Sequence, residues 1–258
     1  MASRIESGCA DALPGLRAEV LERCPSTQTH VIERARAGER APLAVFAEAQ
    51  TAGRGRLGRS WASPARVNLY VSILLRTEVP LERLSGVTLG MALAVADALV
   101  PVGVEAGIKW PNDLLAGGRK ISGILTELVD DVAGASALVI GIGVNLNAER
   151  AEFPAELHET ATSVALETGQ QVDRTRFAAL LLAAVGRRWR VLEAGGFAAL
   201  RPEWETRHVL TGQRVTVAAG ESIAGLVRGV DDGGALLVEG PGGVQRVISG
   251  EATLRRET

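Results

Sequence analysis

The sequence predicts an α+β protein made of one large domain and a small C-terminal β-barrel. Up to about residue 210, strand-like apolar runs are interleaved with segments of helical spacing, so sheet and helices belong to one domain. From Thr211 onward the composition changes to short β-type runs separated by glycine-rich turns. A chain of 258 residues can bury a full core and hold both parts. We therefore expect one domain at 1–210 and a second at 211–258.

Each element of the first domain follows from its residue pattern. Six segments have the apolar or alternating character of strands: 16–24, expected at a sheet edge, 43–50, 68–75 and, approximately, 106–110, 121–129 and 137–144. Four segments indicate helices: 25–37, 82–100, 174–193 and 196–207. The first of these helices begins at Ser26 and Thr27, whose hydroxyls are able to accept hydrogen bonds from the free amides of the first turn. It should end at Gly38.

The C-terminal residues carry four β-type runs with a turn signal after each of the first three. The runs are 214–217, 224–230, 235–238 and 244–248, and the turns fall at 219–220, 231–234 and 240–243. Tight hairpins of this kind predict a small barrel. A unit of roughly 48 residues is too small to be very stable alone, so we expect it to dock on the first domain.

Composition and charge disfavour several classes of function. A net charge of −2 argues against a surface that neutralises nucleic-acid phosphates. Cys9 and Cys24 are too few for a disulfide framework, and the three histidines are too scattered to predict a metal site. The N-terminus lacks the apolar run of a signal peptide. The most apolar stretch, 86–104, contains Asp97 and Pro101 and predicts a buried helix, so we expect a cytoplasmic protein with no membrane partner.

Lysine and asparagine are concentrated in one region of the chain. Of 28 basic residues only Lys109 and Lys120 are lysine, and both lie in the segment 109–125. Three of the four asparagines lie in that segment or in 141–147. Lysine carries a compact charge on a flexible stem that can follow an anion as it reacts, whereas arginine is a planar fork. The alternative explanation of this clustering is a biased base composition together with chance. The clustering predicts a polar site for an anionic ligand near 109–147.

A second motif, Gly53-Arg-Gly-Arg-Leu-Gly-Arg-Ser-Trp61, combines three glycines with three arginines. Glycines let the backbone approach a ligand closely, and arginines grip carboxylate or phosphate oxygens in pairs. The string is neither a phosphate-binding P-loop nor a dinucleotide motif. Its like charges repel, so we expect a loop that an anion orders. The alternatives are a solvated basic loop and an arginine-glycine segment for RNA, and the single copy and negative net charge disfavour the latter.

Nucleophilic catalysis is disfavoured. Neither cysteine lies near these motifs, no Gly-x-Ser-x-Gly string occurs, and Ser26 and Ser122 have no identifiable histidine partner. The predicted site suits positioning and charge neutralisation, as phosphoryl and nucleotidyl transfer require.

Four strings in this chain together resemble those of biotin protein ligases. They are Gly53–Trp61, Lys109-Trp-Pro-Asn-Asp-Leu114, Lys120-Ile-Ser-Gly-Ile-Leu125 and Gly141-Ile-Gly-Val-Asn-Leu-Asn147, and the likeness extends through 161–164 into the terminal barrel. The resemblance implies a mixed β-sheet flanked by helices, related to class II aminoacyl-tRNA synthetases, followed by an SH3-like barrel. It also implies a monofunctional ligase without an N-terminal DNA-binding domain.

The reaction that the resemblance implies has two steps. Biotin and MgATP form biotinyl-5′-AMP and pyrophosphate. A lysine of a biotin carboxyl carrier protein domain, part of a biotin-dependent carboxylase such as acetyl-CoA carboxylase, then takes the biotin. ATP, Mg²⁺ and biotin are therefore the expected small molecules, and the carrier domain is the expected partner of a monomer or weak homodimer that binds no DNA.

By match to the family strings, the resemblance assigns site residues to two groups. The biotin side comprises Ser26, Thr27, Gln28, Gln50, Arg54, Gly55, Arg56, Trp61, Lys120 and Gly123. The ATP side comprises Arg59, Lys109, Asn112, Asp113 and Asn145. Lys120, at the reacting carboxylate and α-phosphate, and Arg56, which would close over them, are the expected catalytic residues. Lys109, Asn112 and Asp113 would arrange phosphates and Mg²⁺, with no dedicated metal ligand assigned.

Simpler interpretations of single residues remain open. In these interpretations Ser26 and Thr27 only cap a helix, Trp61 and Trp110 are plain core, and Asp113 is a turn residue.

Two departures from the family pattern concern affinity and leave the central cations untouched. Gln28 stands where the family commonly has asparagine, and Leu57 where it often has a basic residue.

Three rival functions remain: a lipoate or octanoyl ligase or transferase of the same fold, a DNA-binding repressor, and a binding module without catalysis. Only about fifteen residues precede the first expected strand, short of the roughly 50 of a small domain, which disfavours the repressor.

Overall fold

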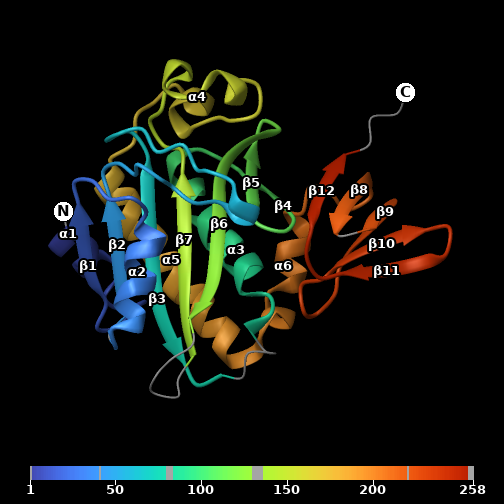
Figure 1. Ribbon diagram of the computed structural model, residues 1–258, viewed down its shortest axis with the longest axis horizontal. Coiled ribbons are helices and arrows are strands. Elements are labelled where there is room, and N and C mark those ends of the chain that lie inside the picture. The colour runs from blue at the N-terminus through green and yellow to red at the C-terminus, as the bar shows by residue number, and fades with distance from the viewer. Residues whose placement is uncertain (1, 41, 80–83, 130–135, 220, 255–258) are drawn as a thin grey trace.

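A seven-stranded mixed sheet is the centre of the main domain (Figure 1). The computed structural model describes residues 2–40, 42–79, 84–129, 136–219 and 221–254. The strand order is β1-β2-β3-β7-β6-β5-β4, and only the β1–β2 pair among these described strands is parallel. The strands are β1 (Arg17–Leu21), β2 (Leu43–Ala47), β3 (Leu69–Thr77), β4 (Gly107–Lys109), β5 (Asp113–Ala116), β6 (Arg119–Val129) and β7 (Ser136–Val144).

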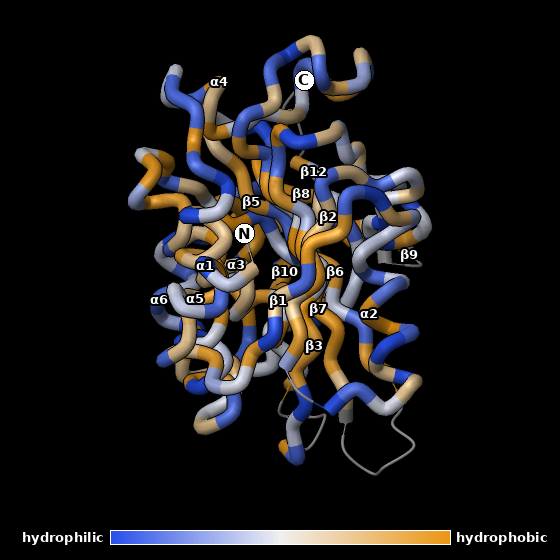
Figure 2. Tube along the Cα trace, turned by 90° about the vertical axis from the view of Figure 1, so that its left-hand side faces the viewer, coloured by the Kyte–Doolittle hydropathy of each residue, from blue (hydrophilic) through white to orange (hydrophobic). Residues whose placement is uncertain are grey.

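Helices cover both faces of this sheet. On one face α2 (Thr27–Arg36) packs through Val31 and Ile32, which meet Leu74 of β3. On the other face lie α3 (Val87–Leu99) and α5 (Arg174–Gly195), with α1 (Ala2–Cys9) packed against α5. Figure 2 shows the hydrophobic strands between these two layers of helix. Because both faces are covered, β3 is an almost unbroken apolar run rather than an alternating one.

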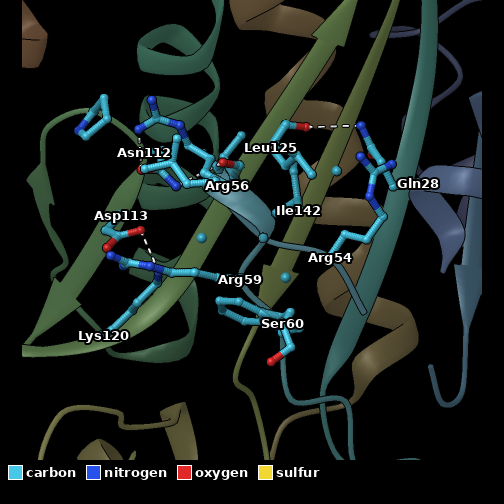
Figure 3. A pocket seen from close by; sticks show the side chains of 18 of the residues that line it. Gln28, Arg54, Arg56, Arg59, Ser60, Asn112, Asp113, Lys120, Leu125 and Ile142 are labelled. Atoms are coloured by element: carbon cyan, nitrogen blue, oxygen red, sulfur yellow. Dashed lines mark hydrogen bonds and ion pairs between the residues drawn. The ribbon is translucent and has the colours of Figure 1, made fainter. Parts of the chain in front are cut away.

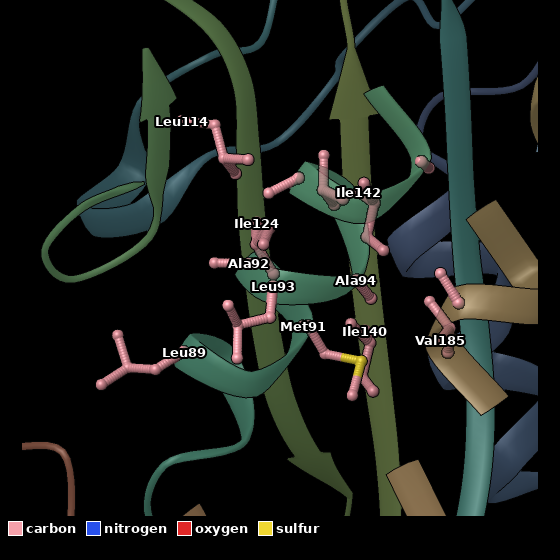
Figure 4. Close-up of a cluster of buried hydrophobic side chains, with 14 of the residues drawn as sticks. Leu89, Met91, Ala92, Leu93, Ala94, Leu114, Ile124, Ile140, Ile142 and Val185 are labelled. Atoms are coloured by element: carbon pink, nitrogen blue, oxygen red, sulfur yellow. The ribbon is translucent and has the colours of Figure 1, made fainter. Parts of the chain in front are cut away.

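The largest core lies between the sheet and α3. Met91 and Leu93 of this helix are fully buried, and they pack near Ile124 and Ile140 of the central strands (Figure 4). A helix that is apolar nearly all round must be covered on all sides. The helix expected at 82–100 is shorter in the structure. It begins at Val87, after a turn at residues 84–86, and residues 82–83 lie outside the described part.

The C-terminal part is a five-stranded antiparallel sheet with the order β11-β10-β9-β8-β12, here called the C-terminal sheet. Its strands are β8 (Arg214–Ala219), β9 (Glu221–Val230), β10 (Leu236–Gly240), β11 (Gly243–Val247) and β12 (Glu251–Leu254). Val227 and Leu236 belong to the same buried cluster as α3, so this sheet is docked on the main domain, as its small size requires. Trp110 strengthens the contact between the main domain and the C-terminal sheet, because its indole Nε1 donates a hydrogen bond to the Gly234 carbonyl at 3.0 Å.

Several elements differ from expectation. The single helix expected at 196–207 is wrong: a short 3₁₀ turn at Phe197–Ala199 is followed by α6 (Arg201–Thr206). Pro202 in the first turn of α6 explains the break, since proline has no amide to continue a preceding helix but fits a helix start. Among the described α-helices and strands, four were not expected: α1, β5, α4 (Val164–Thr168) and β12. Within the described residues, no helix combines the length and apolar character needed to cross a membrane.

Candidate active site

One cavity opens where α2, the central strands and the C-terminal sheet meet. It encloses about 930 Å³ of empty space, part of it open to solvent. The loop Gly53–Trp61, here called the glycine-arginine loop, forms one wall, and Gly250, Glu251 and Ala252 of the C-terminal sheet form another. Figure 3 shows lining side chains from α2, the glycine-arginine loop, β5, β6 and β7.

Fourteen of the fifteen expected site residues line this cavity: Ser26, Thr27, Gln28, Gln50, Arg54, Gly55, Arg56, Arg59, Trp61, Lys109, Asn112, Asp113, Lys120 and Gly123. Asn145 is the exception. Its side chain is buried away from the cavity, where Nδ2 donates to the Thr162 carbonyl at 2.9 Å and Oδ1 faces Asn68 Nδ2 at 3.4 Å. The structure thus shows Asn145 joining the segment after β7 to its neighbours, and a contact with ATP stays a prediction.

The inner end of the cavity is a neutral polar floor. Thr27 Oγ1 lies 2.9 Å from Ser72 Oγ, and both the backbone N–H and the hydroxyl of Thr27 donate to Gln50 Oε1, at 2.9 and 3.2 Å. Gln28 is buried beside them, and Ser72 donates to its Oε1 at 3.0 Å. Hydroxyls and amides without net charge suit a neutral hydrogen-bonding ligand group.

The capping role expected for Ser26 and Thr27 is wrong. Ser26 is the N-cap residue of α2, yet its side chain makes no capping hydrogen bond. Its Oγ is buried and has no hydrogen-bond partner among the described residues, while the Thr27 hydroxyl is used by Gln50 and Ser72. A buried hydroxyl without a partner costs stability, so its position in the cavity lining indicates a contact reserved for a ligand.

Trp61 lies across two glycines of the central strands. A Cβ built on Gly143 would be 2.4 Å from the Trp61 ring, and one built on Gly123 would be 2.9 Å from it. Lys120 Nζ lies 5.5 Å from the ring centroid, within the range of a cation–π contact. The indole is only half-buried and forms part of the cavity wall, so Trp61 is more than a core residue. Trp110 also lines the cavity, but its side chain is fully buried.

Cations gather at the opposite end of the cavity. Lys120 Nζ lies 2.6 Å from Asp113 Oδ1, and Asp113 is the first residue of β5 rather than a turn residue (Figure 3). Arg56 Nη1 donates to Asn112 Oδ1 at 3.2 Å. Burial is the main cause that lowers the pKa of Arg56, although the guanidinium keeps its charge at neutral pH. Lys109 also lines this end, which therefore suits anionic oxygens.

The C-terminal sheet contributes directly to this cationic end. Arg59 Nη1 donates to Glu251 Oε1 at 2.9 Å, so the glycine-arginine loop is joined to β12. The hydrogen bond from Arg59 is the main cause that lowers the pKa of Glu251. Both side chains are largely solvent-exposed, at 63% and 40%, so the pair contributes no more than about 1 kcal/mol.

Sequence reasoning missed further lining residues, and four of them contact expected site residues: Ser72, Gly141, Gly143 and Glu251. A signal existed for three of them. Ser72 is the polar residue in the otherwise apolar core of β3, and the two glycines alternate within the 141–147 string. No local pattern marks Glu251, which reaches the site because the C-terminal sheet folds back on the main domain.

Comparisons with known proteins place these features in a family. A family model described as "Biotin/lipoate A/B protein ligase family" matches residues 20–145, and one described as "Biotin protein ligase C terminal domain" matches 210–255. The biotin–[acetyl-CoA-carboxylase] ligase of Paracoccus denitrificans is 37% identical over 215 residues, which cover 80% of this chain and 88% of that protein. The chain belongs to the biotin protein ligase family.

Further relatives support this membership. The bifunctional ligase/repressor BirA of Bacillus spizizenii is 35% identical over 213 residues, or 81% of this chain, and the match spans 65% of that protein's length. Among solved structures, the biotin protein ligase from Aquifex aeolicus in complex with biotin and ATP has a TM-score of 0.80 at 30% identity. That match covers 93% of this chain and 99% of the other.

Proposed function

We propose that this chain activates biotin with MgATP to biotinyl-5′-AMP and transfers the biotin to one lysine of a biotin carboxyl carrier protein domain. One observation carries the proposal: a single cavity joins a neutral polar floor, including the free Ser26 Oγ, to an end lined by Lys120, Arg56 and Lys109. The neutral end suits the ureido ring of biotin. The cationic end suits the biotin carboxylate and the phosphates of ATP.

The first proposed step joins two anions. An oxygen of the biotin carboxylate attacks the α-phosphorus of ATP, the bond to the β-phosphate oxygen breaks, and pyrophosphate leaves. Two negative groups repel at this distance, so fixed positive charge lowers the barrier. We assign this charge to Lys120 Nζ, because a flexible ammonium that binds Asp113 in the free protein can exchange toward the reacting oxygens. Arg56 would hold the acyl-phosphate from the loop side.

The second proposed step moves the biotinyl group to the carrier. The neutral amine of the acceptor lysine attacks the acyl carbon and an amide bond forms. AMP leaves with the electrons of the broken acyl–oxygen bond, and the nitrogen releases one proton to solvent. Trp61, whose ring lies over Gly143 and Gly123, would cover the tail of the intermediate and limit access of water to the reactive anhydride until the carrier arrives.

Magnesium fits this site as a companion of the ATP phosphates. The Asp113 and Glu251 carboxylates and the Asn112 amide line the cationic end, and oxygen ligands of this kind suit Mg²⁺. No group of three or more histidine, cysteine, aspartate or glutamate side chains in the described ranges forms a ready metal site. Asp113, Glu251 and Asn112 would therefore hold a Mg²⁺ ion that enters with the nucleotide. The positive charge of that ion would offset the negative charge of the phosphates.

The same proposal covers the architecture and the partner. We assign residues 1–210 to the catalytic domain, related to class II aminoacyl-tRNA synthetases, and 211–258 to an SH3-like barrel that closes the nucleotide end. The acceptor is a carrier domain of a biotin-dependent carboxylase in the cytoplasm. The name of the Paracoccus relative, a biotin–[acetyl-CoA-carboxylase] ligase, supports the carboxylase, and the Arg59–Glu251 contact supports the closing role.

The deciding experiment incubates the protein with ATP, a purified carrier domain, and biotin or lipoate. We expect a mass increase on one carrier lysine with biotin and none with lipoate. Lys120→Ala should lower single-turnover adenylation by two to three orders of magnitude, or about 3–4 kcal/mol, because charge is lost at the reacting centre without loss of core volume. Lys120→Arg should also be poor, since a planar fork does not replace an ammonium. Near-normal adenylation by Lys120→Ala, or a preference for lipoate, would refute the assignment.

A further inference from the structure

Glu127, on β6, connects the glycine-arginine loop to the interior of the protein. Its Oε1 accepts a hydrogen bond from Arg54 Nη2 at 2.8 Å, and its Oε2 accepts one from Gln28 Nε2 at 2.9 Å. The two contacts use different oxygens, so the carboxylate makes both at once. Hydrogen bonds to an ionised carboxylate are stronger than those between neutral groups. One side chain therefore joins a loop cation to a buried amide.

The inner end of this connection is held rigidly. The Gln28 side chain is 3% exposed and receives a hydrogen bond from Ser72 Oγ at 3.0 Å. Its Nε2 also lies 3.2 Å from the Val139 carbonyl. A Cβ built on Gly141 would lie 2.5 Å from Gln28 Oε1, so the glycine leaves the space that the amide occupies. Since Ser72 in turn contacts Thr27, the polar floor is continuous with Glu127.

The outer end explains why the loop has three arginines. Each contacts a different part of the molecule: Arg54 reaches β6, Arg56 reaches Asn112 and Arg59 reaches β12. The charge of Arg54 is offset by Glu127, which leaves Arg56 and Lys120 as the cations nearer the reacting end. Arg54 therefore serves to hold the loop rather than to neutralise phosphate.

We propose that Glu127 is a positioning residue that couples occupation of the polar floor to closure of the glycine-arginine loop, through the relay Gln28–Glu127–Arg54. A partly exposed ion pair is normally weak because ordering two long side chains costs entropy. Here Gln28 orders the carboxylate in advance, so the pair holds the loop more firmly than exposure alone predicts. A ligand that rigidifies the floor would strengthen the same relay. This last consequence rests on the proposed biotin activation.

The first test needs no ligand. Limited chymotrypsin digestion reports loop opening through cleavage after Trp61, whose half-buried ring lies over Gly143 and has to be released before the protease can bind it. Glu127→Gln keeps the shape but turns one acceptor oxygen into a donor, and Gln28→Asn shortens the inner arm by one methylene. Each should raise the cleavage rate by about tenfold through loss of one charge-assisted hydrogen bond. Glu239→Gln is the matched control, because Glu239 forms a comparable pair with Arg228 on the C-terminal sheet. Rates equal to the control would overturn the relay.

The second test is a double-mutant cycle with Gln28→Asn and Arg54→Ala, read by biotin affinity and by the dissociation rate of biotinyl-5′-AMP. Each single change should weaken retention by about tenfold. If both residues act through Glu127, the double variant should be no worse than the poorer single variant. Multiplied effects, near a hundredfold, would show two independent ligand contacts and overturn the proposal.

Failure of the proposed function would look different. A wild-type protein that forms no adenylate contradicts biotin activation, and the digestion experiment then still decides the relay. Conversely, an active ligase whose Glu127→Gln variant has an unchanged loop contradicts the relay alone. Adenylation with both substrates saturating should change far less than biotin retention in Glu127→Gln, because Glu127 does not line the cavity. Equal losses in both quantities would contradict a positioning role.

Discussion

Acid should destabilise this protein through one buried histidine at the joint between its two parts. His208 follows α6 and is 7% exposed, and its ring lies 4.4 Å from the Trp204 ring, centroid to centroid, with the two planes tilted by 34°. Its Nδ1 lies 2.8 Å from Thr211 Oγ1, and its Nε2 has no hydrogen-bond partner in the described structure. Burial removes the imidazole from water and so disfavours its protonated, charged form. It lowers the pKa of His208 from 6.5 to about 4.

The direction of the effect follows from proton linkage. Between about pH 6.5 and pH 4 the unfolded chain binds a proton on His208 and the folded chain does not, so protonation favours unfolding. The stabilisation from neutral His208 is complete above pH 6.5 and is lost as the pH falls through this window. With these two pKa values the loss amounts to about 2 kcal/mol at pH 5.0 and is negligible at pH 7.5.

Urea unfolding of the wild type and of His208→Gln at pH 7.5 and pH 5.0 measures this quantity. Glutamine keeps a polar side chain of similar size but does not titrate. Between pH 7.5 and pH 5.0 the wild type should lose about 2 kcal/mol more unfolding free energy than His208→Gln does. Taking a difference cancels the contribution of the carboxylates that both proteins share. A difference that is the same at both pH values would refute the reasoning.

Two further predictions concern the cavity. Gly143→Ala should weaken biotin binding by about tenfold or more, because the new methyl group would overlap the Trp61 ring and overpacking costs about 1–3 kcal/mol. Calorimetry checks it, and Gly242→Ala, which meets no atom within 4 Å, should bind normally; equal affinities for the two variants would contradict the close packing. Arg59→Ala and Glu251→Ala should each raise the KM for ATP about fivefold, with the double variant no worse than either, since they form one exposed pair. Multiplied effects in steady-state adenylation would show that the two residues act separately.

Local patterns were sufficient for most of the strands, and for the motifs, that build the cavity. The strand expected at 43–50 and the helix ending before Gly38 are present, because buried strands need apolar runs and a glycine with φ near +88° ends the helix. The short strand β5 escaped notice because four residues carry too little pattern to separate a strand from a turn. The prediction that Ser26 caps the helix is wrong for another reason: its hydroxyl has no hydrogen-bond partner among the described residues and lines the cavity instead.

The sequence by itself determined the family strings and, with them, the cations and glycines of the site, since each of those signals lies within a dozen consecutive residues. Only the tertiary structure decided which partners those residues have. Arg54 meets Glu127, and Arg59 meets Glu251, across 73 and 192 residues of chain. Such contacts depend on strand order and on the docking of the C-terminal sheet, which are set by packing of the whole core. No local spacing encodes them, because a pair so distant in sequence is brought together only by the fold.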